Sequence, residues 1–348
     1  MSSYVIKKSN LSTYLKRLND KFELWAPLTE DGITQFHPYK GLDDIDCMTR
    51  TRISVKSFFL PQRELMFRYS MRPDEVVPEQ ILPESQTAIF GVKPCDARAM
   101  HLNTRIMIHD ETNPNQDAYF QARLQNTILI GYGCDQPGAT CFCHTAGGDP
   151  FGHEGLDALI TDLGGQLLMT LMDSGSSSKR LIEKDLMDDA KDEDLAAAQQ
   201  ISQAARDMMG SGPKLQQSVG DIKSLFDLPV WEETALRCLN CGICTYLCPT
   251  CTCFDMIDHF TEKCGNQSRC WDSCMFRLFT QHASGHNPRP GKKERLRQRF
   301  MHKLRYFPER HGGDVGCVGC GRCVLYCPVN IDIREVADQM VQHGGNCA

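Results

Sequence analysis

Two short, uninterrupted apolar runs stand out in the first half of the chain, at residues 87–92 and 126–132. Such runs predict strands that are covered on both faces, as in a parallel sheet. Asp96 follows the first run closely, and an acidic side chain there favours the start of a helix. Residues 157–163 and 166–172 flank the pair Gly164-Gly165 and predict a hairpin with a glycine turn. The pattern therefore predicts an α/β domain over residues 1–172.

The pattern changes after this domain. Residues 173–228 combine a serine- and glycine-rich stretch, an acidic stretch and an alanine-rich helix near 195–209. This composition predicts a solvated linker and an exposed helix, with a binding role as the alternative. Residues 229–348 form the third unit and hold 14 of the 19 cysteines. The expected fold is thus α/β or α+β, with a separate cysteine-rich C-terminal domain.

Composition and charge narrow the class of protein. The chain has 348 residues and a formal net charge of −6. Nineteen cysteines without an apolar N-terminal leader indicate metal binding or catalysis rather than a disulfide framework. No apolar run reaches the length of a membrane span, so we expect a soluble cytoplasmic protein without direct membrane insertion. The negative charge disfavours nucleic acid as a partner.

One cysteine pattern, CxxCxxCxxxCP, occurs twice near the C-terminus. In bacterial ferredoxins it holds two 4Fe-4S clusters, and each copy lends its fourth cysteine to the other cluster. A zinc ribbon is the alternative, but it needs only two CxxC pairs and no proline after the last thiol. The predicted ligands are Cys238, Cys241, Cys244 and Cys327 for cluster 1, and Cys317, Cys320, Cys323 and Cys248 for cluster 2.

A long insert, residues 249–316, separates the two copies. It carries five further cysteines and, between residues 289 and 310, nine Lys or Arg. We interpret the basic segment as an amphipathic helix that faces solvent. The alternative is a docking face for an acidic partner subunit, since complementary charge sets orientation and association rate. The insert is therefore expected to be helical.

Four cysteines in the α/β domain are placed to meet. Cys95 follows the first apolar strand, Cys134 follows the second, and Cys141 and Cys143 lie in the next loop. If the strands are parallel, these thiols emerge at the carboxyl edge of the sheet, where open α/β sheets bind ligands. Four thiols suit a third 4Fe-4S cluster, cluster 3. Spacing alone also allows zinc, a redox disulfide or buried free thiols.

Several stretches together resemble one known family, the iron–sulfur electron-transfer subunits found in anaerobic sulfite reductase and, as the beta subunit, in cytoplasmic sulfhydrogenases. The resemblance covers about residues 85–330 and implies an N-terminal α/β domain followed by a two-cluster ferredoxin domain. It also implies that Cys95, Cys134, Cys141 and Cys143 ligate cluster 3. The stretches are residues 91–100, 140–143, 248–254, 271–274 and 285–286.

The resemblance implies a function as well. Family members pass electrons between a subunit that binds flavin and oxidises NAD(P)H and a catalytic subunit of the hydrogenase, sulfite reductase or heterodisulfide reductase type. We therefore expect an electron-transfer subunit that has 4Fe-4S clusters and no catalytic residue of its own. The alternative is a catalytic iron–sulfur subunit in which cluster 3 is accessible to substrate. The sequence has no GxGxxG turn, P-loop, HExxH or GxSxG motif.

Some residues near these motifs have no assigned role. Cys251, Cys253 and Cys274 match recurrent family positions but are one thiol short of a cluster's ligand shell. They either pack as small apolar residues or bind a further metal. Lys93 and Arg98 are candidates for tuning a nearby cluster, because positive charge raises its potential. Ion pairing at the surface is the alternative for both.

Overall fold

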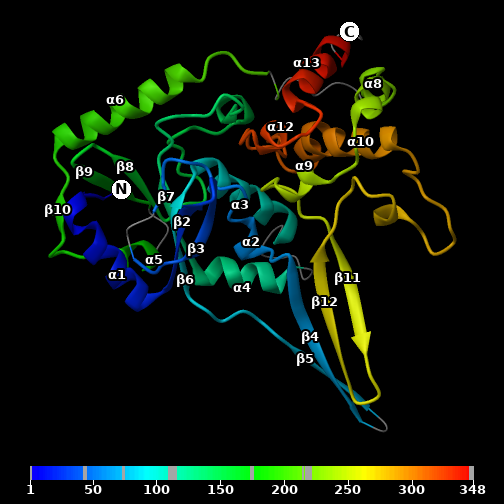
Figure 1. Cartoon of the computed structure of the whole chain (residues 1–348), viewed down its shortest axis with the longest axis horizontal. Coiled ribbons are helices and arrows are strands. Elements are labelled where there is room, and N and C mark those ends of the chain that lie inside the picture. Colours follow the sequence, from blue (N-terminus) through cyan, green and yellow to red (C-terminus); the bar gives the residue numbers. More distant parts are fainter. Residues whose placement is uncertain are drawn as a thin grey trace.

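The computed structural model describes residues 2–41, 45–72, 75–108, 116–172, 176–213, 215 and 222–344. Its main body is built on an eight-stranded sheet (Figure 1). In spatial order, the strands are β10 (Met187–Asp189), β1 (Ser3–Lys7), β9 (Gln166–Leu171), β8 (Ala158–Asp162), β7 (Thr127–Tyr132), β6 (Thr87–Val92), β2 (Glu23–Glu30) and β3 (Ile33–Pro38).

The centre of this sheet is parallel, as the two apolar runs predict. Strands β2, β6, β7 and β8 pair in parallel, whereas β8 and β9 form the predicted hairpin. Ala88 and Phe90 of β6 pack in one hydrophobic cluster with helix α1 (Leu11–Lys21), and Ile89 and Val92 pack in the other with α3 (Pro94–Met107). Both faces are covered, which explains why the run is apolar without interruption.

Helix α3 begins where β6 ends, at the carboxyl edge of the sheet. Pro94 occupies its first turn, where the missing N–H costs nothing, and Asp96 lies in the same turn. The predicted helix start is therefore confirmed. This turn holds Cys95 at the sheet edge.

The segment predicted as a linker contributes to the main sheet. Strand β10 pairs antiparallel with β1 at the sheet's edge. The acidic stretch before it is anchored, since Glu183 accepts hydrogen bonds from Lys21 and Arg17. Helix α6 (Asp192–Met208) confirms the predicted helix, and most of its side chains are exposed or half-buried. The boundary predicted at 172–173 adjoins residues 173–175, which lie outside the described residues, as do 214 and 216–221.

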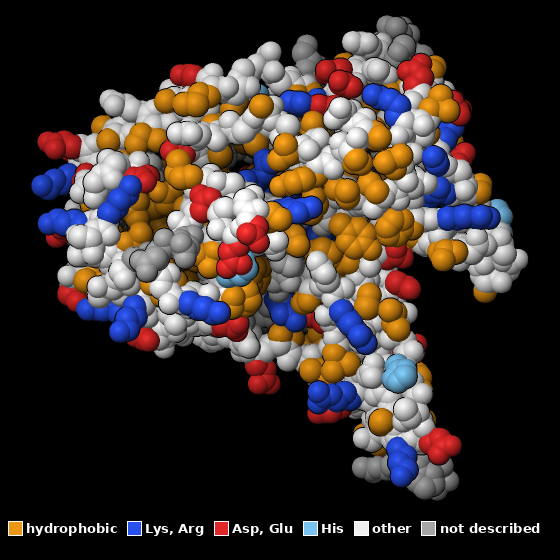
Figure 2. Space-filling view, viewed as in Figure 1, with side chains coloured by type: hydrophobic (Ala, Val, Ile, Leu, Met, Phe, Trp, Pro, Cys, Tyr) orange, Lys and Arg blue, Asp and Glu red, His pale blue; other side chains and the backbone are white. Residues whose placement is uncertain are grey.

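A second sheet extends from the body as an arm (Figure 1). It is antiparallel and joins β4 (Arg63–Arg72) and β5 (Glu75–Gln80) to the insert's β12 (Cys264–Trp271) and β11 (Phe254–Phe260). The expectation of a purely helical insert is thus wrong for this hairpin. All seven residues of β11 are exposed, and Figure 2 shows hydrophobic side chains along the arm.

The C-terminal half packs around its own core. Trp231 of α8 (Val230–Arg237) stacks on Phe300 of α10 (Lys292–Met301) with 6.2 Å between ring centroids. The basic segment therefore does not simply face solvent. Arg295, Arg299 and Lys303 are all buried, because the same helix face that carries its apolar residues also carries these cations.

The remaining elements are short or flank these sheets. Helices α2 and α4 pack with α3 on the second face of the main sheet. In chain order, these elements are η1 (Lys8–Asn10), α2 (Lys56–Phe59), α4 (Ala118–Asn126), η2 (Cys143–Ala146), α5 (Ser176–Lys179), α7 (Ile222–Phe226), α9 (Ile243–Tyr246), η4 (Leu278–Thr280), η5 (His302–Tyr306), α11 (Phe307–Arg310), α12 (Arg322–Leu325) and α13 (Ile333–Gly344).

Candidate metal centres

The four cysteines of the α/β domain line one cavity of about 290 Å³, which we call cavity 3. Cys95 reaches it from the first turn of α3 after β6, and Cys134 reaches it just beyond β7. Because β6 and β7 are parallel, their carboxyl ends meet at this edge. Cys141 and Cys143 enter from the following loop. The structure thus brings together all four residues that the sequence places here.

The two ferredoxin motifs line two further cavities. Cavity 1, of about 30 Å³, is lined by Cys238, Cys241, Cys244 and Cys327. Cavity 2, of about 10 Å³, is lined by Cys248, Cys317, Cys320 and Cys323. Each cavity is therefore lined by the full predicted ligand set, with three thiols from one copy of the motif and the fourth from the other, and Cys323 also lines cavity 1.

The two copies fold alike for a local reason. Gly242 and Gly321 occupy equivalent places and have φ values of 74° and 72°, a left-handed conformation that favours glycine. Each caps the start of a four-residue helix, α9 or α12, which carries the third cysteine of its motif. The chain therefore reverses sharply between the second and third thiols, so that both point into one cavity.

The three cavities lie in a row. Cys320 lines both cavity 3 and cavity 2, and Cys323 lines both cavity 2 and cavity 1. The loop of the α/β domain touches the C-terminal motif directly, because the Phe142 N–H donates to the Gly319 carbonyl over 2.8 Å. A Cβ added at Gly321 would lie 2.6 Å from the Thr140 carbonyl carbon, so only glycine fits at this contact.

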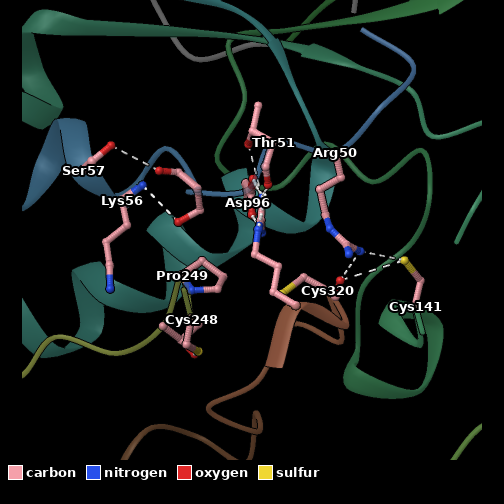
Figure 3. Close-up of polar contacts among 12 residues, drawn as sticks. Arg50, Thr51, Lys56, Ser57, Asp96, Cys141, Cys248, Pro249 and Cys320 are labelled. Atoms are coloured by element: carbon pink, nitrogen blue, oxygen red, sulfur yellow. Dashed lines mark hydrogen bonds and ion pairs between the residues drawn. The ribbon is translucent and has the colours of Figure 1, made fainter. Parts of the chain in front are cut away.

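Arg50 connects cavities 2 and 3, and its role was not predicted from the sequence. Its Nη1 donates to Cys141 Sγ over 2.9 Å and to the carbonyl oxygen of Cys320 (Figure 3). Nearby, Arg322 forms a buried ion pair with Asp96 and donates to the Thr51 carbonyl. No motif marks Arg50 or Thr51, since both precede the apolar strands in an irregular segment.

Buried cations surround the ferredoxin cavities. Lys303 Nζ donates to Thr250 Oγ1 over 2.8 Å and to the Gly316 carbonyl over 3.0 Å. Burial alone would lower the pKa of Lys303, but negative charge on the sulfurs of Cys248, Cys251 and Cys317 raises it further than burial lowers it. Such charges in the interior require negative partners. Cysteines deprotonated by binding iron at these cavities would meet that requirement.

Lys56 reaches the same region from the N-terminal half. Its Nζ donates to the carbonyls of Tyr246 and Cys251 and lies 4.0 Å from the centroid of the Trp271 ring. Burial lowers the pKa of Lys56 in spite of the neighbouring thiols. In Figure 3, Lys56 lies in the same part of the view as Cys248 and Pro249, away from Arg50 and Cys141.

Lys93 and Arg98, the two predicted tuning residues, differ in position. Lys93 lines cavity 3 and is 5% exposed, and its Nζ has no hydrogen-bond partner. Arg98 is also buried but pairs with Glu154 over 2.8 Å and with Asp314 over 3.1 Å. The positive charge available to cavity 3 therefore comes from Lys93 and Arg50.

Three cysteines of the insert, Cys251, Cys253 and Cys274, lie near the first ferredoxin motif. The thiols of Cys248 and Cys251 hydrogen-bond to each other, as do those of Cys253 and Cys274. The bond to Cys274 lowers the pKa of Cys253 to about 7. Among the described residues, no group of three or more His, Cys, Asp or Glu is arranged to hold a single metal ion.

The residues that line the three cavities fit 4Fe-4S clusters by their donor chemistry. Each cavity offers at least four cysteine thiols, and four thiols are the ligands that such clusters take from proteins. Buried cations stand close to each set and offset the negative charge of thiolate-ligated iron. The fit depends on the donors and their charge environment rather than on free volume, which differs widely among the cavities.

Comparisons with known proteins agree with this chemistry. Residues 237–331 match the model of a family described as a 4Fe-4S dicluster domain. The chain is similar to sulfhydrogenase 2 subunit beta of Pyrococcus furiosus, with 28% identity over 330 residues, which are 94% of this chain and 95% of that protein. No solved structure matches. In the part of the chain that the structure describes, no helix has the length and apolar character needed to cross a membrane.

Proposed function

We propose that the chain, which matches a 4Fe-4S dicluster domain over residues 237–331 and is similar to a sulfhydrogenase beta subunit, relays electrons within a multisubunit oxidoreductase. The observation that carries the proposal is the row of three cavities, each lined by all four thiols of one predicted ligand set. Neighbouring cavities share a cysteine in their walls, so centres bound there would be adjacent. A relay needs this adjacency and no acid, base or nucleophile.

The proposed ligand sets are those predicted from the sequence. Bound 4Fe-4S clusters would supply one-electron centres. The residues of the chain would hold these centres, keep water away from them and set their charge environment. Cavity 1 would hold its cluster through Cys238, Cys241, Cys244 and Cys327, cavity 2 through Cys317, Cys320, Cys323 and Cys248, and cavity 3 through Cys95, Cys134, Cys141 and Cys143.

The proposed partners follow from the relative. Its name describes a subunit of a sulfhydrogenase, which supports a catalytic partner of the hydrogenase type, with sulfite reductase and heterodisulfide reductase types as alternatives. At the other end of the relay we propose a flavin subunit that oxidises NAD(P)H. Copurification of the chain with its native complex, followed by mass spectrometry of the subunits, tests both partners.

The metal content tests the function directly. Protein prepared without oxygen should contain about twelve iron atoms per chain, the number for three four-iron clusters. Cys134→Ser should retain about eight, because only cavity 3 loses a ligand. Cys47→Ser is the matched control, since Cys47 is buried but lines none of the three cavities. Zinc in place of iron would contradict the proposal, and about eight iron atoms in the wild type would remove cluster 3 from it.

One observation favours a second candidate function, catalysis at cavity 3. This cavity is far larger than the other two, and the Nζ of Lys93 at its wall has no hydrogen-bond partner. A small anion bound there would pair with Lys93. Adding sulfite to the reduced protein tests this candidate. Cluster 3 is identified as the electron paramagnetic resonance (EPR) signal that is absent from Cys134→Ser. A change in this signal on adding sulfite would support catalysis, whereas unchanged signals would support the electron relay alone.

A further inference from the structure

Arg299 lies between the two ferredoxin cavities. It belongs to helix α10 of the insert and is 4% exposed. Its side chain lines cavity 1 together with Cys244, and it lines cavity 2 together with Cys248. Among the described residues, only Arg299 and Cys323 line both of these cavities.

The guanidinium of Arg299 is poorly satisfied by the protein. Its Nε is buried without a hydrogen-bond partner, and no ion pair with a carboxylate is found for it among the described residues. Its nearest described ring contact is with Phe300, whose centroid lies 4.6 Å from Cζ. A buried cation without a partner is strongly unfavourable. The cysteine sulfurs on its two sides, as thiolates, are therefore its electrostatic partners.

Neighbouring cations show that this arrangement is particular to Arg299. Arg295, one turn earlier on α10, is equally buried, but its guanidinium donates to the carbonyls of Met275, Arg289 and Pro290. Lys303 is satisfied by Thr250 and Gly316 and lines cavity 2 only.

We propose that Arg299 is a shared counter-charge that raises the reduction potentials of clusters 1 and 2 together. The inference rests on the proposed function, because it requires clusters in both cavities. Reduction adds one negative charge to a cluster, and a cation held nearby in the poorly polarisable interior favours that state. One cation between two clusters acts on both. The insert would thus raise both potentials through a single side chain.

Redox titration of the holoprotein monitored by EPR spectroscopy tests the proposal. Arg299→Met should lower the midpoint potentials of clusters 1 and 2 by at least about 59 mV each, a tenfold loss in the equilibrium constant for one-electron reduction. The potential of cluster 3, identified as the signal that Cys134→Ser removes, should not move. Arg299→Lys should keep both potentials near the wild-type values, because it retains the charge.

Arg297→Met is the matched control on the same helix. Arg297 stacks on Phe226, with 3.4 Å from Cζ to the ring centroid, and lines neither ferredoxin cavity. Its substitution should leave all three potentials unchanged. A shift as large as that of Arg299→Met would show that any lost charge on α10 has the same effect, and would overturn the proposal.

The remaining outcomes also decide the matter. Wild-type protein without iron defeats the proposed function, whereas full iron with unmoved potentials in Arg299→Met overturns only this inference. A shift confined to one cluster overturns the shared role. If Arg299→Met loses iron, the test rests on Arg299→Lys. Full iron content and wild-type midpoint potentials in Arg299→Lys would then support the proposal. Loss of iron in both variants, or equal shifts in both, overturns it.

Discussion

The buried ion pair between Arg322 and Asp96 offers the sharpest test of how the two halves of the chain hold together. Arg322 lies between two cysteines of the second ferredoxin motif, and Asp96 lies in the first turn of α3. Their side chains are 0% and 1% exposed, and the guanidinium donates to both carboxylate oxygens over 2.5 and 2.7 Å. Asp96→Asn keeps the shape and removes the charge.

The size of the effect follows from these contacts. Removing one partner of a buried pair costs about 3–5 kcal/mol, since it leaves the other charge uncompensated. Arg322 retains its bonds to the Thr51 carbonyl, at 2.9 and 2.8 Å, which favours the lower end of that range. At about 2–4 °C per kcal/mol, the melting temperature should fall by about 6–12 °C. Replacing both partners, with Asp96→Leu and Arg322→Met, should restore much of the loss.

Thermal unfolding followed by circular dichroism, without oxygen and at one fixed scan rate, measures this effect. The control is Glu232→Gln, which breaks the exposed pair with Lys293, where the side chains are 62% and 38% exposed. An exposed pair contributes at most about 1 kcal/mol. If Asp96→Asn melts at the same temperature as Glu232→Gln, the buried pair does not stabilise the junction and the argument is wrong.

Two further predictions concern the contact between Gly321 and Thr140 and the buried thiol of Cys47. Gly321→Ala should lower the melting temperature and the iron content, because the added Cβ would clash with the Thr140 carbonyl. The control is Gly313→Ala, which is also at positive φ but has no atom within 4 Å of the added Cβ and should therefore show the effect of backbone strain alone. Equal losses in the two variants would contradict the clash. Burial raises the pKa of the Cys47 thiol to about 12, so little of it is thiolate at pH 8. Because the thiolate is the form that reacts, the rate of alkylation by iodoacetamide should rise about tenfold per pH unit between pH 8 and 10. Peptide mass spectrometry measures this rate. The exposed Cys264 should be modified readily at pH 8. Rapid modification of Cys47 at that pH would contradict the raised pKa and the burial of its thiol.

The sequence predicts the parts of this molecule that local chemistry determines. Strands β6 and β7 are continuous apolar runs because both sheet faces are covered, and their parallel pairing places Cys95 and Cys134 at one edge. The resemblance to the iron–sulfur subunits is confirmed by the dicluster match at 237–331 and by the similarity along nearly the whole chain. The ligand sets stay predictions, now with a cavity for each.

The rest depends on contacts between distant segments. Strand β11 has the sequence FDMIDHF, in which apolar and acidic residues give no clear period, and its strand form depends on pairing with β12 and, through it, β4. The buried cations of α10 were predicted to face solvent, since a basic helix is ordinarily exposed. Their burial depends on partners outside the helix, backbone carbonyls for Arg295 and the ferredoxin cysteines for Arg299, and no local pattern in residues 289–310 reveals those neighbours.

The sheet of the arm has a consequence for how the protein is made. Strand β4 pairs with β12, whose residues follow it by about two hundred positions. At about 5–20 residues per second, a ribosome needs on the order of 10–40 s to reach them. Throughout that interval the nascent chain carries a β4–β5 hairpin with an open edge, which can pair with any other available strand. The yield of native protein should therefore depend on translation speed and on chaperones that protect this edge.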